Sequence, residues 1–545
     1  MREPQDRGCG GAQPQQHRAN GEPALVRSRD LRTRFDIESL SAAALHFVTV
    51  LKSLSQTQPR ETRCFPTLPP DRGCGEAQPP HVHRAKNEIS ALAATALSVF
   101  RLQISNFPLS ILNPGVFLPR ALFPIVMLVT ATSHASPTLP NAPAQAFPAH
   151  LSEIGLFADT AKMEPGPTML QYELNVPFWS DGANKTRWIV IPEDKSKRIR
   201  FNPTSEWSFP EGTAFVKHFD LPVDENHPEI LRRLETRVLV SDGHGGVFGV
   251  TYKWRADNSD ADLLATNLLE DVVIRTASGT RTQKWYYPSR EDCLICHTKL
   301  AGGVLGVTAR QMNRETRDRA GHAESQLIRW KHLGLFEGDP ADESLLRSPA
   351  LVRADDDRSS LDLRARSWMD ANCAHCHRPG GTVATFDARF NTPAEQQNLV
   401  SGPVLIDHGL DNARVIAAND VWRSVGFQRI KAVDEFKMPP VGRQVVDMLG
   451  LELMRQWIQS LPGPPVLAPP VISGTPGEGS TRVVIANADP EATVRYTLDG
   501  SAPTKTSEIY SGPITLTNST TVRARAYREK STRSITVNET FILEP

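Results

Sequence analysis

Two pentapeptides of the form Cys-x-x-Cys-His constrain this chain more than any other feature. They are Cys293-Leu294-Ile295-Cys296-His297 and Cys373-Ala374-His375-Cys376-His377. Each places two thiols about one helical turn apart, with a histidine directly after the second thiol. Covalent attachment of a c-type haem needs this spacing, because the thiols add to the porphyrin vinyl groups and the histidine binds the iron. The sequence therefore predicts two covalently bound haems and their irons, attached through Cys293, Cys296, Cys373 and Cys376, with His297 and His377 as proximal ligands.

Two other uses of paired cysteines fit less well. A zinc site needs further ligands that converge on each pair. A four-cysteine site shared by the two pentapeptides is possible in principle, but it leaves the histidine after each pair without a role. A thioredoxin-like dithiol is disfavoured because neither pair follows an apolar strand that would open a βαβ unit.

The length, the charge and the positions of the cysteines limit the class of protein to which this chain can belong. The 545 residues are enough for three or four domains. The chain has 61 Lys plus Arg and 61 Asp plus Glu, so no field of one sign argues for a nucleic acid partner or an acidic membrane. After residue 74 every cysteine lies in a pentapeptide, which leaves no disulfide framework. Because haem c is attached outside the bacterial cytoplasm, we expect an exported protein, periplasmic or secreted.

A candidate export signal lies at residues 116–135. Phe117-Leu118-Pro119-Arg120 precedes an apolar run at 121–131, and Ser133-His134-Ala135 is a small-x-small end that suits cleavage after Ala135. The run is too short to span a bilayer, so we expect no transmembrane helix in the mature chain. Residues 1–115 are rich in Pro, Gln, Arg and Gly, and we expect them to be disordered or a misassigned upstream extension.

Residues 150–288 have the pattern of an antiparallel β-domain. Short runs of aromatic and β-branched residues alternate with turn sequences such as Ser180-Asp181-Gly182-Ala183 and Ser241-Asp242-Gly243. The predicted strands are Tyr172–Trp179, Arg187–Ile191, Thr213–Phe219, Thr236–Val240, Gly246–Trp254, Val272–Thr276 and Gln283–Tyr287. A first haem segment follows at 289–350, with helices expected at Ala309–Arg319 and Glu324–Gly334.

Residues 358–461 have the pattern of a helical domain around the second pentapeptide. One apolar stripe precedes it, formed by Leu361, Ala365, Trp368 and Met369, and a second closes the domain, formed by Val446, Leu449, Leu453, Trp457 and Leu461. Between them, Lys437-Met438-Pro439-Pro440 resembles the distal ligand loop of class I cytochromes c. That resemblance implies that Met438 is the sixth iron ligand of the second haem.

The sixth ligand of the first haem is left open by the sequence. No second Met-Pro-Pro loop follows His297 before the next pentapeptide. The candidates are His218, Met312, His322 and His332, and an open or water-bound iron is the other possibility. His375 occupies an x position of its pentapeptide, and we expect it to point away from the iron.

The C-terminal part has a different pattern. Residues 462–470 form a proline-rich linker, and 471–545 alternate in strand fashion at Thr481–Ala486, Thr493–Thr497, Ile514–Leu516, Thr521–Tyr527 and Thr540–Leu543. The stretches Tyr496–Thr504 and Tyr510–Ile514 resemble the immunoglobulin-like module at the C-terminus of chitobiase and β-hexosaminidase. The resemblance implies a β-sandwich used for spacing or attachment, without catalytic residues. We expect Asp499 to be a turn residue.

The longest resemblance covers residues 151–461. The motifs that carry it are Val176–Ala183, Phe209–Thr213, Leu234–Arg237, Tyr287–Arg290 and Asn372–Gly380. They are similar to those of exported bacterial di-haem c-type cytochromes with an N-terminal β-domain. The expected fold is therefore multidomain α+β, with an antiparallel β-domain, helical cytochrome c domains and a C-terminal Ig-like β-sandwich.

Two functions from different classes follow from this pattern. The first is a non-catalytic electron carrier between a redox protein donor and an acceptor, which the resemblance implies. The alternative is an enzyme of the di-haem peroxidase or oxidase kind, with an open first haem, although no residue suggests itself as a catalytic acid or base. A third interpretation makes the β-domain a docking or ligand-binding module around Trp179–Ala183.

Overall fold

The computed structural model describes residues 137–543, apart from 141, 143–144, 195, 318–320 and 383–384. The expectations for residues 1–115 and for a signal peptide at 116–135 concern residues outside this range. The described part is mainly β-sheet, with seven α-helices. In this part of the chain, no helix combines the length and the apolar character that crossing a membrane requires.

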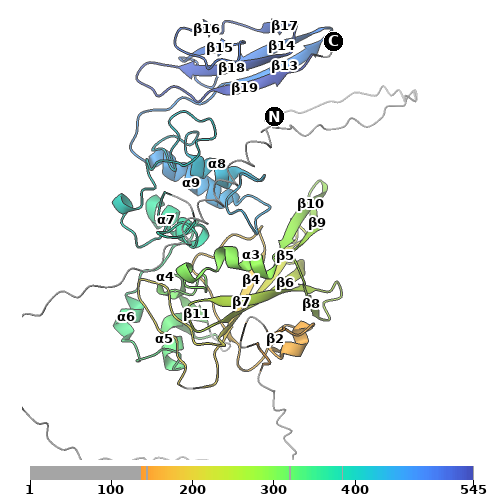
Figure 1. The fold of residues 1–545 in the computed structure, drawn as a ribbon, viewed down its shortest axis with the longest axis vertical. Coiled ribbons are helices and arrows are strands. Elements are labelled where there is room, and N and C mark those ends of the chain that lie inside the picture. Colours follow the sequence, from red (N-terminus) through yellow and green to blue (C-terminus); the bar gives the residue numbers. More distant parts are fainter. Residues whose placement is uncertain are drawn as a thin grey trace, which may run out of the picture. The chain divides into compact units, whose positions relative to one another are not determined.

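A six-stranded antiparallel sheet forms the centre of the first part (Figure 1). Its order is β3-β4-β5-β6-β7-β8, and each strand pairs with its neighbour in sequence. The strands are β3 (Leu170–Gln171), β4 (Asn184–Val190), β5 (Ala214–Pro222), β6 (Leu231–Ser241), β7 (Val247–Trp254) and β8 (Ala261–Leu263). Consecutive hairpins are the simplest way to build such a sheet, because each turn brings the next strand alongside.

The two faces of this sheet pack against different cores. Even-numbered side chains such as Trp188, Val216 and Val238 pack on one side against η2 (Leu151–Ile154) and β1 (Phe157–Asp159), which pairs with β2 (Glu164–Pro165). Odd-numbered side chains, among them Phe215 and Leu239, face the opposite side. Both faces of the central strands are therefore covered, and even polar residues such as His218 and Thr236 are buried there.

The predicted strand Tyr172–Trp179 is wrong, because β3 already ends at Gln171. After β3 the chain runs without regular structure, and its backbone groups bond to side chains from distant elements. Gln326 Oε1 accepts from the Glu173 N–H at 2.8 Å, and Gln311 Oε1 accepts from the Val176 N–H at 2.9 Å. These glutamines satisfy the backbone that a neighbouring strand would otherwise satisfy, so high strand propensity did not produce a strand here.

A hairpin and a series of short elements follow the sheet. The hairpin is β9 (Leu268–Thr276) with β10 (Gly279–Tyr287), and it leads directly into α3 (Arg290–Cys296). The next elements are η3 (Lys299–Ala301), α4 (Ala309–Met312), β11 (Glu315–Arg317), β12 (Ala323–Ser325), α5 (Gln326–His332) and α6 (Asp342–Leu346).

The helix predicted at 309–319 is therefore wrong in length. It ends at Met312, and the chain turns into β11. The Asn313 side-chain amide donates to Ser348 O at 2.6 Å, which ties the chain to a distant loop at this point. The helix predicted at 324–334 is shorter than expected, because residues 323–325 pair as β12 with β11. Tertiary hydrogen bonds override local helix propensity in both places.

A small helical core follows, made of α7 (Leu361–Asn372), η4 (Ala394–Gln396), α8 (Val425–Lys431) and α9 (Met448–Ser460). Helices α7 and α9 exchange a reciprocal pair of bonds: Trp368 Nε1 donates to Asp447 at 2.8 Å, and Trp457 Nε1 donates to Asp362 at 3.0 Å. Gly450 allows this close approach, since a Cβ there would lie 2.3 Å from Trp368 Nε1. The predicted stripe is corrected at Leu449, which is half exposed because Gly450 faces the partner helix.

The C-terminal part is a β-sandwich. One sheet has the order β13-β14-β17 and the other β16-β15-β18-β19. The strands are β13 (Val471–Gly477), β14 (Ser480–Ala486), β15 (Thr493–Thr497), β16 (Glu508–Ile509), β17 (Ile514–Leu516), β18 (Thr520–Tyr527) and β19 (Val537–Phe541). Buried residues of both sheets, including Val483, Tyr496 and Val522, form one core, so the predicted Ig-like sandwich is confirmed. Asp499 accepts from Ser501 N at 2.9 Å, as a turn residue does.

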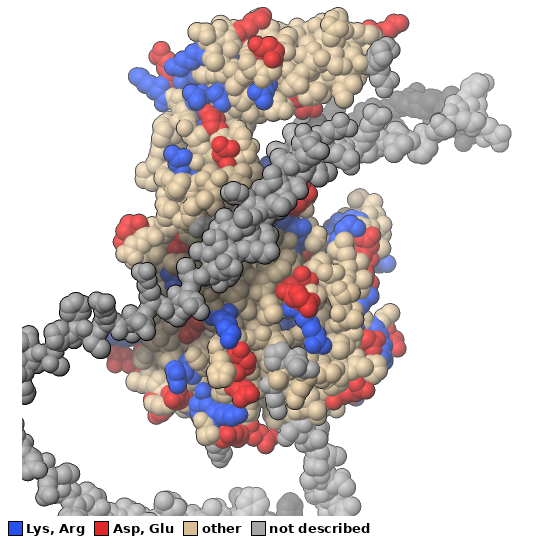
Figure 2. Space-filling model, in the orientation of Figure 1, with Lys and Arg blue, Asp and Glu red and all other residues tan. Residues whose placement is uncertain are grey.

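Charges of both signs are interspersed on one face of the molecule (Figure 2). On the face drawn in Figure 2, patches of Lys and Arg lie beside patches of Asp and Glu. This distribution agrees with the formal net charge of zero.

Candidate functional site

The first pentapeptide is carried by α3, whose start is fixed by its sequence. Ser289 Oγ accepts from the Asp292 N–H at 3.2 Å, while Asp292 Oδ2 accepts from the Ser289 N–H at 2.9 Å. This capping box sets the register of the helix. Cys293 and Cys296 then lie one turn apart, and the His297 N–H donates to Cys293 O at 2.9 Å. The turn therefore presents two thiols and one imidazole together.

His297 has the features of a metal-binding imidazole. Its Nδ1 lies 2.7 Å from Gly303 O, and because a carbonyl only accepts, Nδ1 carries the proton and Nε2 keeps its lone pair. Burial lowers the pKa of His297 to about 3, with a further contribution from nearby Lys217. The ring is neutral at physiological pH, oriented by a backbone carbonyl as metal-ligating histidines are.

A large cavity, here called the first cavity, opens beside this histidine. It encloses about 1270 Å³ of space between the atoms, part of it open to solvent. Cys293, Cys296 and His297 line one side of it. Odd-numbered side chains of β4, β5 and β6, such as Phe215 and Leu239, line the sheet side. The β-domain therefore supplies a wall of the space next to the first pentapeptide.

The second pentapeptide follows the end of α7. The Cys373 N–H donates to Met369 O at 2.7 Å, and the His377 N–H donates to Cys373 O at 2.9 Å. The His377 ring stacks on Phe386, with centroids 4.3 Å apart and planes 16° apart. Burial lowers the pKa of His377 to about 4, so this imidazole is also neutral. Its buried Nδ1 has no hydrogen-bond partner in the described part of the chain, unlike Nδ1 of His297.

The second cavity brings Met438 and His377 to one place. It encloses about 650 Å³ and is lined by Cys373, Cys376 and His377 together with Met438. The remaining lining is mostly apolar, and includes Trp179, Ile295, Trp368, Ile430, Pro439, Pro440 and Leu451. The methionine predicted as a ligand, both thiols and the imidazole thus surround the same mainly apolar space.

The loop that carries Met438 is held from two sides. The Met438 N–H donates to Arg429 O at 3.0 Å, and the buried Arg443 guanidinium donates to Ile430 O at 3.2 Å and to Ala432 O, at the C-terminal end of α8. Last-turn carbonyls lack helical partners, so a cation is favourable there.

On its other side, this loop is bound by the β-domain. The Asp181 carboxylate accepts from Gln444 N at 2.9 Å and from Val445 N at 2.8 Å. Trp179 Nε1 donates to Val445 O at 2.9 Å, and the Trp179 backbone N–H donates to Asn372 Oδ1 at 2.9 Å, at the end of α7. The segment Trp179–Ala183 therefore docks within the chain, between the sheet and the helical core. The sequence marked Asp181 only as a turn residue, and Arg443 carried no signal.

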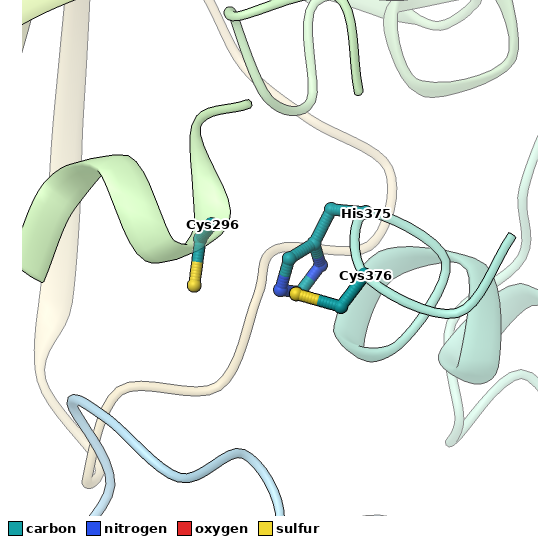
Figure 3. Close-up of side chains that lie close together, drawn as sticks. All are labelled: Cys296, His375 and Cys376. Carbon is teal, nitrogen blue, oxygen red and sulfur yellow. The ribbon is translucent and has the colours of Figure 1, made fainter. Parts of the chain in front are cut away.

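The two pentapeptides meet at Cys296, His375 and Cys376 (Figure 3). One potential ligand atom from each residue lies within 4.8 Å of the others. His375 is 8% exposed, lines both cavities and packs edge-on against Phe178 with ring centroids 5.7 Å apart. The sequence placed this residue only as a spacer, whereas the fold sets it between the two cavities.

None of the four candidates for a sixth ligand at the first cavity lines that cavity. His218 projects from the opposite face of β5, where its ring nitrogens bond to Thr236 at 2.8 Å and Asp220 at 3.0 Å. Met312 is fully buried in the core, and its sulfur accepts from Gln326 at 3.5 Å. His322 and His332 are exposed. The period of two along β5 excludes His218, since Lys217 is the residue that faces the cavity.

Three cationic side chains in the first cavity were not expected from the sequence. Arg187, Lys217 and Arg237 lie on neighbouring strands and all line it. Burial, together with the neighbouring guanidinium groups of Arg187 and Arg237, lowers the pKa of Lys217 to about 7. The available signal was their position on the same alternating face of the strands. Charged residues in a strand usually indicate the face exposed to solvent, so the signal was not read as a cavity.

The donor set fits two c-type haems. In the described part of the chain, Cys293, Cys296, Cys373 and Cys376 are free thiols and only half buried. Each pair has a neutral imidazole beside it and a cavity in front of it. The residues Cys296, His375 and Cys376 could also hold a metal ion directly, if their thiols were unmodified.

One family model matches the C-terminal part of the chain. No curated protein matches the chain. Residues 483–541, which include most of β14 and run to the end of β19, match the family model described as Fn3 associated. The β-sandwich of this chain is thus similar to the Fn3-associated family.

Proposed function

We propose that this chain is an exported two-haem c-type cytochrome that passes single electrons between redox protein partners. One observation carries the proposal: Met438 lines the same cavity as Cys373, Cys376 and His377. Sixty-one positions separate Met438 from His377 (438 minus 377). Their convergence on a single mainly apolar space supports an iron held between imidazole and thioether.

The residues divide into two sets in this proposal. Cys293, Cys296 and His297 hold the first haem in the first cavity. Cys373, Cys376 and His377 hold the second haem, with Met438 as its sixth ligand. A bound haem supplies the one-electron couple of its iron. The protein contributes the axial ligands and the apolar walls, which exclude water and favour the less charged state of the site.

The short distance between the pentapeptides supports transfer from one haem to the other. Cys296 and Cys376 contribute sulfur atoms within 4.8 Å of each other. If each sulfur forms a thioether, the attached edges of the two porphyrins are neighbours. Electron tunnelling falls steeply with distance, so adjacent edges favour rapid exchange between the irons.

An enzymatic function of the di-haem peroxidase or oxidase kind is the second candidate. It is favoured by one observation: none of the four predicted sixth ligands lines the first cavity. In that case a haem held by Cys293, Cys296 and His297 would keep an open iron site, and one held by Cys373, Cys376 and His377 would be its source of electrons. The carrier remains our preferred function because the motifs of residues 151–461 resemble those of di-haem c-type cytochromes, for which electron transfer is implied.

The remaining parts fit an exported cytochrome. We infer that 150–288 is a β-domain that walls the first haem, 289–350 the first haem segment and 358–461 a class I-like cytochrome c domain. Beyond a linker at 462–470, the finer resemblance of 471–545 to the chitobiase module suggests a spacer or attachment unit. Redox proteins are the expected partners, in the periplasm or outside the cell.

The proposal is tested by producing the chain in a host with haem c maturation and counting haems. We expect two per chain, one after Cys293→Ala with Cys296→Ala, and one after Cys373→Ala with Cys376→Ala. Absence of haem from the wild-type protein would refute the proposal.

Spectroscopy of the same protein separates the two candidate functions. Two low-spin paramagnetic signals, a far-red band lost in Met438→Ala, and no response to carbon monoxide support the carrier. A high-spin signal that shifts when carbon monoxide or peroxide is added favours the enzyme.

A further inference from the structure

A row of three cations crosses the sheet beneath the first cavity. Arg187 on β4 is the register partner of Lys217 on β5, and Lys217 is the partner of Arg237 on β6. Because directly paired residues project to the same face, the three side chains stand side by side. All three line the first cavity. We refer to them as the cation row.

The cation row has too few anionic partners. Arg237 pairs with Glu235 at 2.5 Å, and the Glu235 side chain is fully buried. Arg187 is 7% exposed, its Nε is unpaired, and its Nη1 donates only to Lys185 O at 3.4 Å. Within the described residues, the Lys217 ammonium has no hydrogen bond or ion pair. One carboxylate therefore serves three cations.

Other carboxylates do not fill this deficit. Asp292 lines the first cavity, but its Oδ2 already accepts from Tyr286 at 2.6 Å and from the Ser289 N–H at 2.9 Å. Asp181 binds the loop of Met438. Glu173 pairs with Arg314 at 2.8 Å. The excess positive charge is thus directed at the cavity.

An unpaired row of this kind is costly unless an anion joins it. Like charges directly opposite on neighbouring strands are destabilising, and buried charges require a partner. Guanidinium groups are planar donors that suit the two oxygens of a carboxylate or similar oxyanion. Arg187 and Arg237, at the two ends of the row, are two strand spacings apart, or roughly 10 Å. This distance leaves room for two carboxylates or similar oxyanions.

We propose that Arg187, Lys217 and Arg237 form an oxyanion-binding site in the first cavity. This inference rests on the proposed function, in which that cavity receives the first haem. The oxyanion has two possible sources: the propionate carboxylates of that haem, or a small free oxyanion that reaches an open iron. The first source makes the row a positioning site for the cofactor, and the second makes it the substrate site of the enzymatic alternative.

The variants Arg187→Gln and Lys217→Gln remove one cation each without introducing a new iron ligand. Lys284→Gln is the control, because Lys284 is an exposed cation on β10 that pairs with Asp271 and does not line the cavity. Haem is counted first in all four proteins. Two haems per chain in each variant show that it folds and that the proposed function stands.

The measurements are a calorimetric and optical titration with sodium nitrite and sodium formate, and the midpoint potential of the first haem. A free oxyanion source predicts saturable binding whose dissociation constant rises at least tenfold in Arg187→Gln and Lys217→Gln, and is unchanged in Lys284→Gln. A propionate source predicts no anion binding, but a lower midpoint potential in both row variants, since a positive charge beside the haem is lost. Two haems with neither effect would overturn the inference.

Haem-free wild-type protein would refute the proposed function separately. It would also exclude the propionate source, and the calorimetric titration would then decide the inference. Row-dependent binding of nitrite or formate would support the oxyanion site, and absence of binding would overturn it.

Discussion

The contact between Asp181 and the loop of Met438 gives the sharpest stability prediction. Replacing Asp181 with Ala leaves the Gln444 and Val445 N–H groups without their acceptor, at distances that were 2.9 and 2.8 Å. A buried donor left unsatisfied costs about 1–3 kcal/mol. At about pH 4.5, where the Asp181 carboxyl of the folded wild type is protonated, we therefore expect the alanine variant to lose ~2–6 kcal/mol of unfolding free energy.

The free energy lost in the alanine variant depends on pH, because Asp181 titrates within the accessible range. Burial raises the pKa of Asp181 to about 6, although the hydrogen bonds from Val445 and Gln444 act in the opposite direction. The folded pKa is above the ordinary value of 3.8, so the stabilisation linked to protonation is fully present below 3.8 and is lost as pH rises through about 6. The shift corresponds to ~3 kcal/mol in full, and to ~2 kcal/mol between about pH 4.5 and pH 8. The alanine variant lacks this dependence, so its destabilisation is ~2 kcal/mol smaller at the higher pH.

The assay is urea unfolding followed by loss of the far-red band, which reports release of Met438 in the proposed haem site. The free energy is taken by linear extrapolation at both pH values. Asp242→Ala is a matched control: Asp242 also lies in a Ser-Asp-Gly turn of the β-domain and accepts from two N–H groups, of His244 at 2.7 Å and Gly246 at 2.8 Å. Among the described residues no hydrogen bond or ion pair joins this turn to the loop of Met438, so the far-red transition should not move.

Two results would refute this reasoning. One is an Asp181→Ala transition equal to wild type at both pH values. The other is an effect that grows as pH rises, which would mean that the carboxylate is ionised and stabilising in the folded protein.

Three further predictions concern the packing around the site. Asp181→Asn keeps an acceptor but cannot ionise, so it should unfold at higher urea than wild type at pH 8 and show a flatter pH dependence of the urea midpoint. Gly450→Ala places a Cβ 2.3 Å from Trp368 Nε1. The overpacking should cost ~1–3 kcal/mol, which exceeds the ~1 kcal/mol that alanine gains in helix propensity. We expect a lower Tm by circular dichroism, and an unchanged or raised Tm would contradict this. Arg310→Ala leaves Asp370, its partner at 2.8 Å, buried and unpaired, so a loss of ~3–5 kcal/mol is expected in chemical denaturation, and a change below ~1 kcal/mol would contradict it.

The sequence patterns predicted structure best where backbone groups form hydrogen bonds with a strand that is near in sequence. Strands of the main sheet and of the C-terminal sandwich occur close to their predicted positions, because alternation and turn residues encode hairpins locally. The pattern failed at Tyr172–Trp179 and after Met312, where Gln311, Gln326 and Asn313 make tertiary bonds. Side chains that capture distant backbone groups leave no periodic signal in the sequence.

The candidate site divides in the same way. The sequence by itself determined the two Cys-x-x-Cys-His turns, since their spacing lies within five residues, and it marked Met438 as a candidate ligand from the two prolines that follow it. Only the tertiary structure decided that Met438 and His377 share a cavity, that Cys296, His375 and Cys376 meet, and that Lys217 rather than His218 faces the first pentapeptide. The physical reason is that a strand has two faces and a cavity several walls. Which face is turned toward the site is fixed by packing between elements distant in sequence.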